Sequence, residues 1–372
     1  MNVDRSARTA QPIQPGDSPP ARGLTIRELG NTDAARWQQF VTDYPAANLY
    51  HTLLWRDVVR DVFGHHPVYL FAEEAGLIRG ILPMFHVRFP LLGSKLISIP
   101  YDIGSGGALA LDEAAEVALA EHAVACARDR KVGYLELRYS SPRAWLEPLG
   151  FQRAEPVIIS EMILDGEEQV TARISKDHLH SVRKAAKRGV QVREAKSWED
   201  YLSFYDVYLR VFRAFGTPPY GRRYFRALWD RLHPISAVRL LLAEVNGRAV
   251  GGLQLFCFGK NMVSKFAACL PEAVPLRVYN ALYWEAIRLG LRLGNRRLSW
   301  GTATRQQRGL IEFKDHWGSR SFPAELYALP VRGRAPELEK YYEGYGAVRQ
   351  MWRKLPLRFT SILGGLLNRW YC

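Results

Sequence analysis

An internal repeat constrains the fold of this chain more than any other feature of its sequence. Residues 71–85 align without gaps on residues 242–256, and an Ala, a Glu, two glycines, a Leu and a Phe coincide. Each block has the pattern of a strand, a glycine turn and a second strand, which is typical of a β-hairpin. Because hairpin chemistry alone can produce such a match, the elements around the two blocks decide its meaning.

The surrounding elements follow the same order in both halves: each hairpin precedes another strand, a loop, a long helix and a further strand. The helices are expected at 112–131 and 277–293, and the strands after them at 134–138 and 297–300. We also expect the strand near 157–164 to close the first unit. The sequence therefore predicts the α/β class, with two copies of one fold, each a mixed twisted sheet flanked by helices.

The repeat divides the chain into a first domain at 23–166 and a second at 167–330, between a Pro-, Gln- and Ala-rich leader at 1–22 and a basic amphipathic tail at 331–372. A chain of 372 residues with 48% hydrophobic content can bury a large core in two domains. The leader lacks the apolar run of a signal peptide, and no segment approaches the roughly 20 apolar residues that span a bilayer. We therefore expect a cytoplasmic protein, either soluble or peripheral at the inner face of the membrane.

The charge and the cysteines restrict the partners. A formal net charge of +14 and a pI of about 9.7 indicate an anionic partner: RNA, a phosphorylated carrier, a nucleotide cofactor or an anionic membrane surface. The 4 cysteines show no CxxC spacing, which argues against a zinc site and against a disulfide framework. No metal is expected.

The stretch from Leu298 to Gly318 has the composition of an anion-handling site. A short apolar strand ends at Gly301, a polar loop that includes Arg305 follows, and an amphipathic turn carries Phe313 and Lys314. Lys314 could place its ammonium in a partly desolvated cleft, or it could be a surface lysine whose stem covers apolar neighbours.

A basic helix at 176–188 lies between the two copies. Its cations Arg183, Lys184 and Lys187 fall on one face at helical spacing, opposite an apolar side. Two interpretations stay open: a solvated face, and a phosphate-contacting surface of the cleft between the repeats.

Further candidates for substrate binding lie at the start of the 277–293 helix and in the rigid turn at 216–220. They are Tyr279, Asn280 and Trp284 in the helix and Tyr220 in the turn. Helix N-termini at a sheet edge are common ligand sites, but core packing would also explain these aromatic residues.

Four motifs of the second half occur in a recognisable order. They are the string at 180–192, the Gly216-Thr217-Pro218 turn, the helix start at 279–284 and the motif Phe313-Lys314-x-x-Trp317-Gly318. Together they resemble the FemABX-like branch of the GNAT acyltransferase superfamily, and most of all its tandem-domain proteins associated with bacterial exopolysaccharide and exosortase systems. The resemblance runs from about residue 24 to the C-terminus and includes a tail motif at 352–357.

This resemblance implies two tandem GNAT-like domains with the active cleft at or near the second. Members transfer an acyl group, acetyl or aminoacyl, to an amine or hydroxyl of a cell-envelope or exopolysaccharide precursor. The family's Phe-Lys pair near the reacting centre corresponds to Phe313 and Lys314. Similar proteins often carry Gly-Arg-Ser after the strand, whereas Gly301 here is followed by Thr302 and Ala303, with Arg305 displaced.

The acyl donor is left open between acetyl-CoA and aminoacyl-tRNA. The glycine-containing acyl-CoA fingerprint of ordinary GNAT enzymes is missing, because the equivalent loop from Leu270 to Leu276 has no glycine. The general base is also open, and Glu312, Asp315 and His316 are candidates by proximity to Lys314.

Other classes of function remain alternatives. One is a non-catalytic tandem module that binds anionic glycan-lipid precursors as a scaffold. Another is an RNA-binding protein, which the charge favours although no RRM, KH or interleaved aromatic-basic signature is present. No DNA partner is expected. The tail from Trp352 to Tyr371 could lie on a bilayer or could pack on the second domain.

Overall fold

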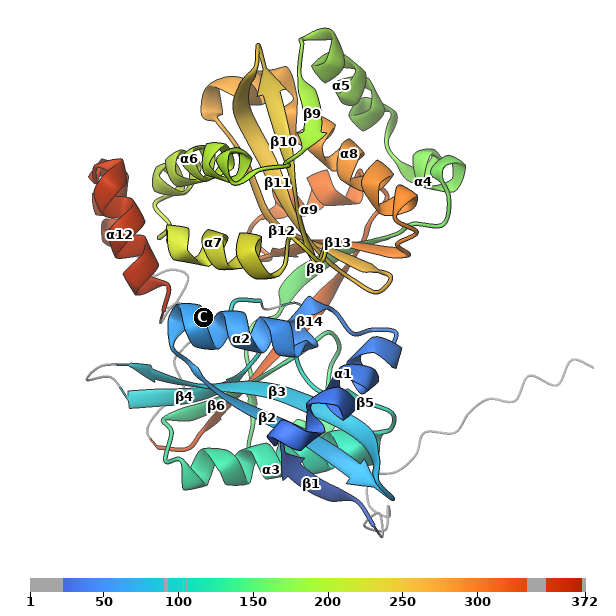
Figure 1. Cartoon of the computed structure of the whole chain (residues 1–372), viewed down its shortest axis with the longest axis vertical. Coiled ribbons are helices and arrows are strands. Elements are labelled where there is room, and N and C mark those ends of the chain that lie inside the picture. Colours follow the sequence, from blue (N-terminus) through green and yellow to red (C-terminus); the bar gives the residue numbers. More distant parts are fainter. Residues whose placement is uncertain (1–22, 90–92, 103, 105, 333–345, 370–372) are drawn as a thin grey trace, which may run out of the picture.

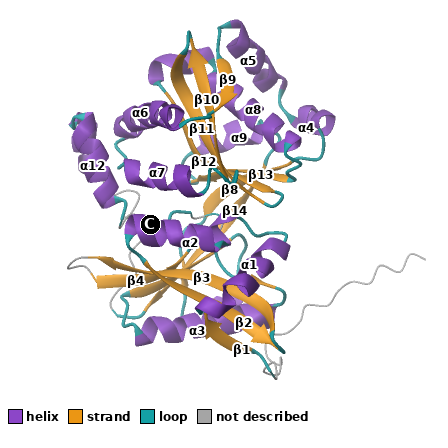
Figure 2. Cartoon of the chain, in the orientation of Figure 1, coloured by secondary structure: helices purple, strands orange, loops and turns teal. Residues whose placement is uncertain are grey.

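A computed structural model describes residues 23–89, 93–102, 104, 106–332 and 346–369 (Figure 1). The predicted leader at 1–22 and parts of the tail lie outside the described residues. One continuous sheet runs through both halves of the chain, with helices on its faces (Figure 2).

The first half forms a sheet covered on both faces. Helices α1 (Ala34–Asp43) and α2 (Leu53–Phe63) pack on one face, and α3 (Glu113–Asp129) packs on the other (Figure 1). Successive strand residues point to opposite faces, so Tyr69 belongs to the α1 and α2 side and Leu70 to the α3 side. The strands are β1 (Thr25–Glu28), β2 (His66–Glu74), β3 (Leu77–Phe89), β4 (Gly93–Ser98), β5 (Leu109–Ala110), β6 (Tyr134–Tyr139) and β7 (Gln152–Arg153).

The second half repeats this plan. Helices α6 (Trp198–Phe215) and α7 (Arg222–Arg231) cover one face, and α5 (Lys176–Lys187) and α8 (Val278–Arg292) cover the other. The remaining elements are β8 (Val157–Ile163), α4 (Glu167–Arg173), β9 (Gln191–Glu194), β10 (Val238–Val245), β11 (Arg248–Phe258), β12 (Asn261–Cys269), β13 (Arg297–Ala303), α9 (Arg308–Asp315) and β14 (Arg320–Pro330).

The two hairpins that revealed the repeat share their irregularities. In β2–β3 the register shifts between Ala72 and Glu73, and in β10–β11 it shifts at the aligned residues Ala243 and Glu244. The turns also correspond, because Ala75 and Gly76 have φ of 49° and 81° while Asn246 and Gly247 have 50° and 72°. Positive φ at both central residues is the type I′ geometry, which suits the twist of a hairpin. The predicted tandem arrangement is confirmed.

The two halves exchange strands at their junction. Strand β14 pairs through Arg320–Ala324 with β8 and through Glu325–Pro330 with β6, and β8 also pairs with β13. The expectation that the strand near 157–164 closes the first unit is therefore wrong. Its apolar pattern identified a strand, but its partners lie more than a hundred residues further along the chain, where local pattern gives no information about pairing.

An apolar interface also joins the halves. The rings of Tyr50 and Trp55 from the first half each lie 5.6 Å from the ring of Phe256 in β11. All three side chains are at most 1% exposed, so they form a shared core and not a wet contact between domains.

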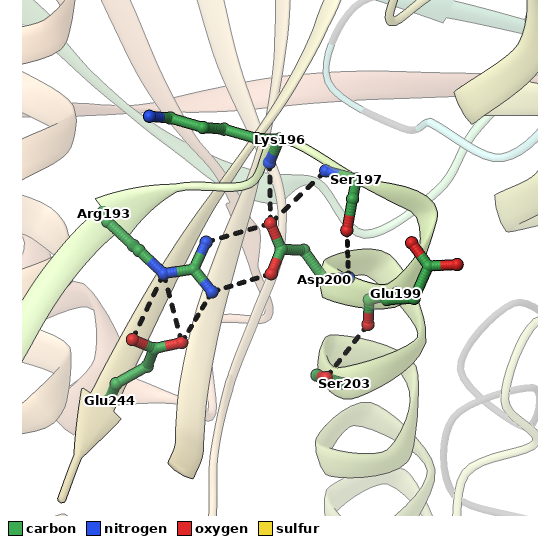
Figure 3. Close-up of polar contacts among 7 residues, drawn as sticks. All are labelled: Arg193, Lys196, Ser197, Glu199, Asp200, Ser203 and Glu244. Carbon is green, nitrogen blue, oxygen red and sulfur yellow. Dashed lines mark hydrogen bonds and ion pairs between the residues drawn. The ribbon is translucent and has the colours of Figure 1, made fainter. Parts of the chain in front are cut away.

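An ion-pair network fixes the start of α6 to the edge of the second sheet (Figure 3). Asp200 accepts hydrogen bonds from the guanidinium of Arg193 at 2.7 and 2.9 Å and from the backbone N–H of Lys196 at 2.7 Å. Arg193 also donates to Glu244 at 2.7 Å. These donors lower the pKa of Asp200 to about 2, chiefly through the hydrogen bonds from Arg193.

The described part of the tail packs on the second half. Helices α11 (Gly346–Lys354) and α12 (Leu357–Leu367) lie against α6, and α12 also contacts α7 (Figure 1). Asn368 Nδ2 donates to the carbonyls of Pro218 and Pro219 at 3.0 and 2.8 Å. Within the described part of the chain, no helix is both long and apolar enough to cross a membrane.

Candidate active site

A cavity opens where two parallel strands of the second half separate. Strands β12 and β13 pair only from Asn261 to Val263 against Arg297 to Ser299. Beyond this point Ser264 and Lys265 of β12 and Trp300 and Gly301 of β13 line a cavity of about 730 Å³. Gly301 has a φ of +72° at the irregularity in the pairing of β13 with β8, which helps to turn β13 away from β12.

The first half supplies the opposite wall of this cavity. Its contributions are Lys95, Tyr101, Asp102, Tyr134, Glu136 and Arg138, together with Leu326 of β14. The cavity therefore lies between the two halves.

Lys314 of α9 reaches this cavity from beneath the loop that follows β13. Its side chain is 2% exposed, and its Nζ donates to the carbonyls of Gly301 at 3.1 Å and Thr302 at 3.2 Å. Burial lowers the pKa of Lys314 to about 8, so the ammonium form still predominates at neutral pH. An ammonium has three N–H donors, and two are used here, which leaves one for a bound group.

Aromatic rings line the same cavity as Lys314. Tyr283 of α8 stacks on Trp300 with centroids 4.3 Å apart, and its ring lies 5.2 Å from that of Phe313. Phe313 is half-buried and also lies 4.9 Å from the ring of His178. These rings keep water from the apolar side of the cavity, which strengthens the electrostatic interactions of the ammonium.

A second cavity of about 380 Å³ meets the first at Phe313, which lines both. It lies at the N-terminus of α8 and is lined by Asp177, His178, His180, Ser181, Arg277, Asn280, Phe313 and His316. Helix α8 has no side-chain cap and no acidic residue in its first turn. His178 is 9% exposed, and its Nε2 has no hydrogen-bond partner among the described residues. Free N–H groups and cations at a helix N-terminus favour an anion.

The corresponding places in the first half carry different charges and hydrogen bonds. Where β4 and β6 end their pairing, the Arg138 guanidinium donates to the carbonyls of Ile99 at 3.0 Å and Asp102 at 2.7 Å. The N-terminus of α3 is capped by Asp112, which accepts from the Ala115 N–H at 2.8 Å, and Glu113 and Glu116 follow in its first turn. These three acidic residues line a cavity at the α3 N-terminus, and their negative charges disfavour a phosphate there.

The structure brings some of the predicted site residues together and separates others. Lys314, Phe313, Tyr220 and Tyr279 line the larger cavity, and Asn280 lines the smaller one. Trp284 is half-buried against the core of the second half. Arg183, Lys184, Lys187 and Arg305 line neither cavity. Among the candidate bases, His316 lines the smaller cavity, whereas Glu312 and Asp315 line neither.

Sequence reasoning missed Lys265 and Asp102. Lys265 donates to the carbonyl of Tyr101, and burial lowers the pKa of its amine to about 8 against the opposing effect of Asp102. The Asp102 Oδ2 is buried and has no hydrogen-bond partner among the described residues. A lysine inside the mostly apolar segment Met262–Ala267 was the available signal for Lys265, and no comparable signal marked Asp102.

Residues 174–315 match a family model described as an acetyltransferase (GNAT) domain. These residues form a GNAT acetyltransferase domain. They include α5, the separated strands and Lys314, so the domain contains all the lining residues that the second half supplies to the two cavities, apart from His316 and Leu326. The chain therefore contains an acyltransferase domain of the GNAT type, and such a domain implies an acyl donor.

Solved structures share the fold over most of the chain. FemX is 14% identical with a TM-score of 0.67, over 88% of this chain and 100% of that one. The C-terminal domain of a putative lysylphosphatidylglycerol synthetase from Agrobacterium fabrum is 12% identical with a TM-score of 0.52, over 84% of this chain and 95% of that one. A tandem GNAT protein from the clavulanic acid biosynthesis pathway is 12% identical with a TM-score of 0.50, over 84% of this chain and 99% of that one.

These likenesses confirm the FemABX-like, tandem GNAT fold that the motifs suggested. The curated proteins contain no match to the sequence. Within the described part of the chain, no three His, Cys, Asp or Glu side chains come together as a metal site would require.

Proposed function

We propose that the GNAT domain transfers an acyl group, acetyl or aminoacyl, to an amine or hydroxyl of a cell-envelope or exopolysaccharide precursor. The observation that carries the transfer step is the position of Lys314, whose ammonium is held by two carbonyls of β13 at the point where β12 and β13 separate. Envelope precursors are carried on lipids, so this transfer would take place at the inner face of the membrane.

In this reaction the acceptor nitrogen or oxygen bonds to the acyl carbonyl carbon, and the bond from that carbon to the donor's leaving atom breaks. The proton leaves the acceptor and the leaving group takes the electron pair. Negative charge develops on the carbonyl oxygen before the bond breaks. The Lys314 ammonium would stabilise that charge, and its burial in the cavity that Tyr283, Trp300 and Phe313 also line supports this role.

Two features support separate places for donor and acceptor. The cavity at the α8 N-terminus contains Arg277 beside an uncapped helix start, which supports binding of the phosphates of acetyl-CoA or of a tRNA 3′ end, and Phe313 lines both this cavity and the larger one. Within the larger cavity, the Asp102 carboxylate suits the ammonium of an amine acceptor and could take its proton.

The direct test is a transfer assay with labelled acetyl-CoA and with charged tRNA, using purified glycan-lipid precursor as acceptor. We expect label to move from one of the two donors, and we expect Lys314→Met to lose this transfer while still binding the precursor. Precursor binding with no transfer from either donor would instead favour the scaffold interpretation.

The donor cavity can be tested by charge reversal. Arg277→Glu should weaken donor binding steeply, because Arg277 lines the cavity at the α8 N-terminus. Arg183→Glu is the matched control, since it makes the same charge change on α5 outside both cavities. Equal losses in the two variants across a salt series would contradict this placement and would indicate a diffuse electrostatic effect.

A further inference from the structure

Helix α12 presents a stripe of large apolar side chains to solvent. Phe359, Ile362 and Leu366 are 57%, 62% and 50% exposed, and their spacing of three and four residues places them on one side of the helix. Leu363 and Leu367, each 40% exposed, widen the same stripe. Such a continuous patch on one helix is unusual for a surface that faces only water.

The opposite side of α12 is the side that holds it to the protein. Thr360, Gly364 and Asn368 are buried. A Cβ on Gly364 would stand 2.5 Å from the carbonyl oxygen of Pro219, so the helix approaches that turn as closely as a glycine allows. Because these contacts fix the rotation of α12, its apolar stripe is presented outward by the fold and is not a core face left uncovered by chance.

The charged side chains of the described tail are all cations. From Gly346 to Arg369 the sequence contains no Asp or Glu, and Arg353, Lys354, Arg358 and Arg369 are exposed. An apolar stripe flanked by cations is complementary to an anionic bilayer, where the apolar side chains enter the acyl boundary and the cations meet the headgroups. A second copy of the chain would bring two such cationic surfaces together in a protein of net charge +14.

We propose that α12 docks the protein on an anionic lipid bilayer through Phe359, Ile362, Leu363, Leu366 and Leu367. The docked surface adjoins the larger cavity, because the Arg369 carbonyl accepts from the Tyr101 hydroxyl at 3.4 Å and Tyr101 lines that cavity. Phe215 also lines the cavity, is 56% exposed, and directly precedes Gly216, which contacts Arg349 at the start of α11. Docking would therefore place the cavity beside the lipid surface. Membrane docking itself does not depend on the proposed function, whereas access to a lipid-linked acceptor does.

The test is flotation of the full chain with vesicles of phosphatidylcholine and phosphatidylglycerol, compared with vesicles of phosphatidylcholine alone. We expect binding to the anionic vesicles and about tenfold or greater weakening in Ile362→Ser with Leu366→Ser. Leu77→Ser with Ile235→Ser is the matched control, because those side chains are 70% and 56% exposed at other places on the surface. The control pair should float like the unchanged protein, and both pairs should keep its melting temperature.

A second comparison separates docking from charge attraction. The double variant Arg353→Gln with Arg358→Gln should weaken flotation. The double variant Arg128→Gln with Arg248→Gln removes the same charge from exposed positions elsewhere on the surface, and it should weaken flotation less. Unchanged flotation in the double serine variant of α12 would overturn the proposal. It would also be overturned if light scattering showed a dimer that this variant converts to a monomer without any vesicle binding, because the stripe would then be an interface between two copies.

Discussion

At the scale of single residues, Lys314 combines burial with charge. Removing an ammonium from water lowers its pKa, and the two carbonyls that accept from Lys314 offset part of this penalty. The sequence left open a partly desolvated lysine and a surface lysine, and a surface lysine could be removed with little loss of stability. The 2% exposure of Lys314 changes that expectation, because removal of its ammonium leaves the carbonyls of the half-buried residues Gly301 and Thr302 without this donor.

We therefore expect Lys314→Met to have two effects. The rate of transfer should fall by about a hundredfold or more, as when an oxyanion donor is removed. The free energy of unfolding should fall by about 1–3 kcal/mol because the Gly301 and Thr302 carbonyls lose their donor. Transfer rates and urea denaturation measure these effects. Lys260→Met, at an exposed turn, is the control and should change neither; an unchanged rate in Lys314→Met would contradict the role of Lys314.

The pKa of Lys314 predicts opposite effects of pH on activity and on stability. Transfer should decline as the pH rises through about 8, where Lys314 loses its proton. Between that value and the unfolded pKa of about 10.4, the unfolded chain binds more protons than the folded one, so the free energy of unfolding should rise with pH. Lys265 contributes to the same rise in stability, since its pKa is also lowered to about 8.

Rate profiles and denaturation series between pH 7 and pH 10 provide the check. The control variant Lys265→Met should still show the decline in transfer rate near pH 8. If the rate of the unchanged protein stays constant up to pH 10, the Lys314 ammonium is not the group that stabilises the charge during transfer.

At the scale of elements, the start of α6 depends on the network in Figure 3. Asp200 holds the Arg193 guanidinium and caps the helix together with Ser197, so one carboxylate serves a strand edge and a helix N-terminus. Asp200→Asn should lower the free energy of unfolding by about 1–2 kcal/mol, because a capping and ion-pair partner loses its charge. Glu199→Gln is the matched control. The Glu199 carboxylate makes no contact with the other residues drawn in Figure 3, so this variant should have little effect on the free energy of unfolding.

The pH dependence of this network has a definite sign. The pKa of Asp200 is lowered on folding to about 2, so its stabilisation is complete above the unfolded value of about 3.9 and is lost as the pH falls through about 2. Acid denaturation should therefore separate Asp200→Asn from the unchanged protein at pH 6 and bring the two together near pH 2. A constant difference between them at all pH values would contradict the ion pair as the cause.

The sequence predicted individual helices and hairpins better than it predicted the candidate site. The hairpins, α3, α8 and the basic helix α5 follow from periodicity, caps and turn residues, all of which act within a few positions. The cationic side of α5 was visible in the sequence, but its position outside both cavities was not, because that depends on how α5 packs across α8. Lys265 and Asp102 meet from strands and loops far apart in the chain, so no local spacing could pair them.

At the scale of the whole molecule, the two halves should unfold together. The shared core of Tyr50, Trp55 and Phe256 and the divided strand β14 couple them. Phe256→Ala should lower the free energy of unfolding by about 3–5 kcal/mol and shift a single transition. Phe258→Ala, at a half-buried position, should cost less. Two separate calorimetric transitions, with only the second displaced by Phe256→Ala, would contradict the coupling.

The division of β14 also has a consequence for synthesis on the ribosome. The first half emerges long before Glu325–Pro330, the segment that pairs with β6. Until that segment is available, the β6 edge of the nascent first unit lacks its final partner, and it is open to pairing with other chains. The order of translation therefore delays completion of the first unit until most of the second has been made. A cell that slows or truncates translation in between would accumulate an aggregation-prone intermediate and not a finished half.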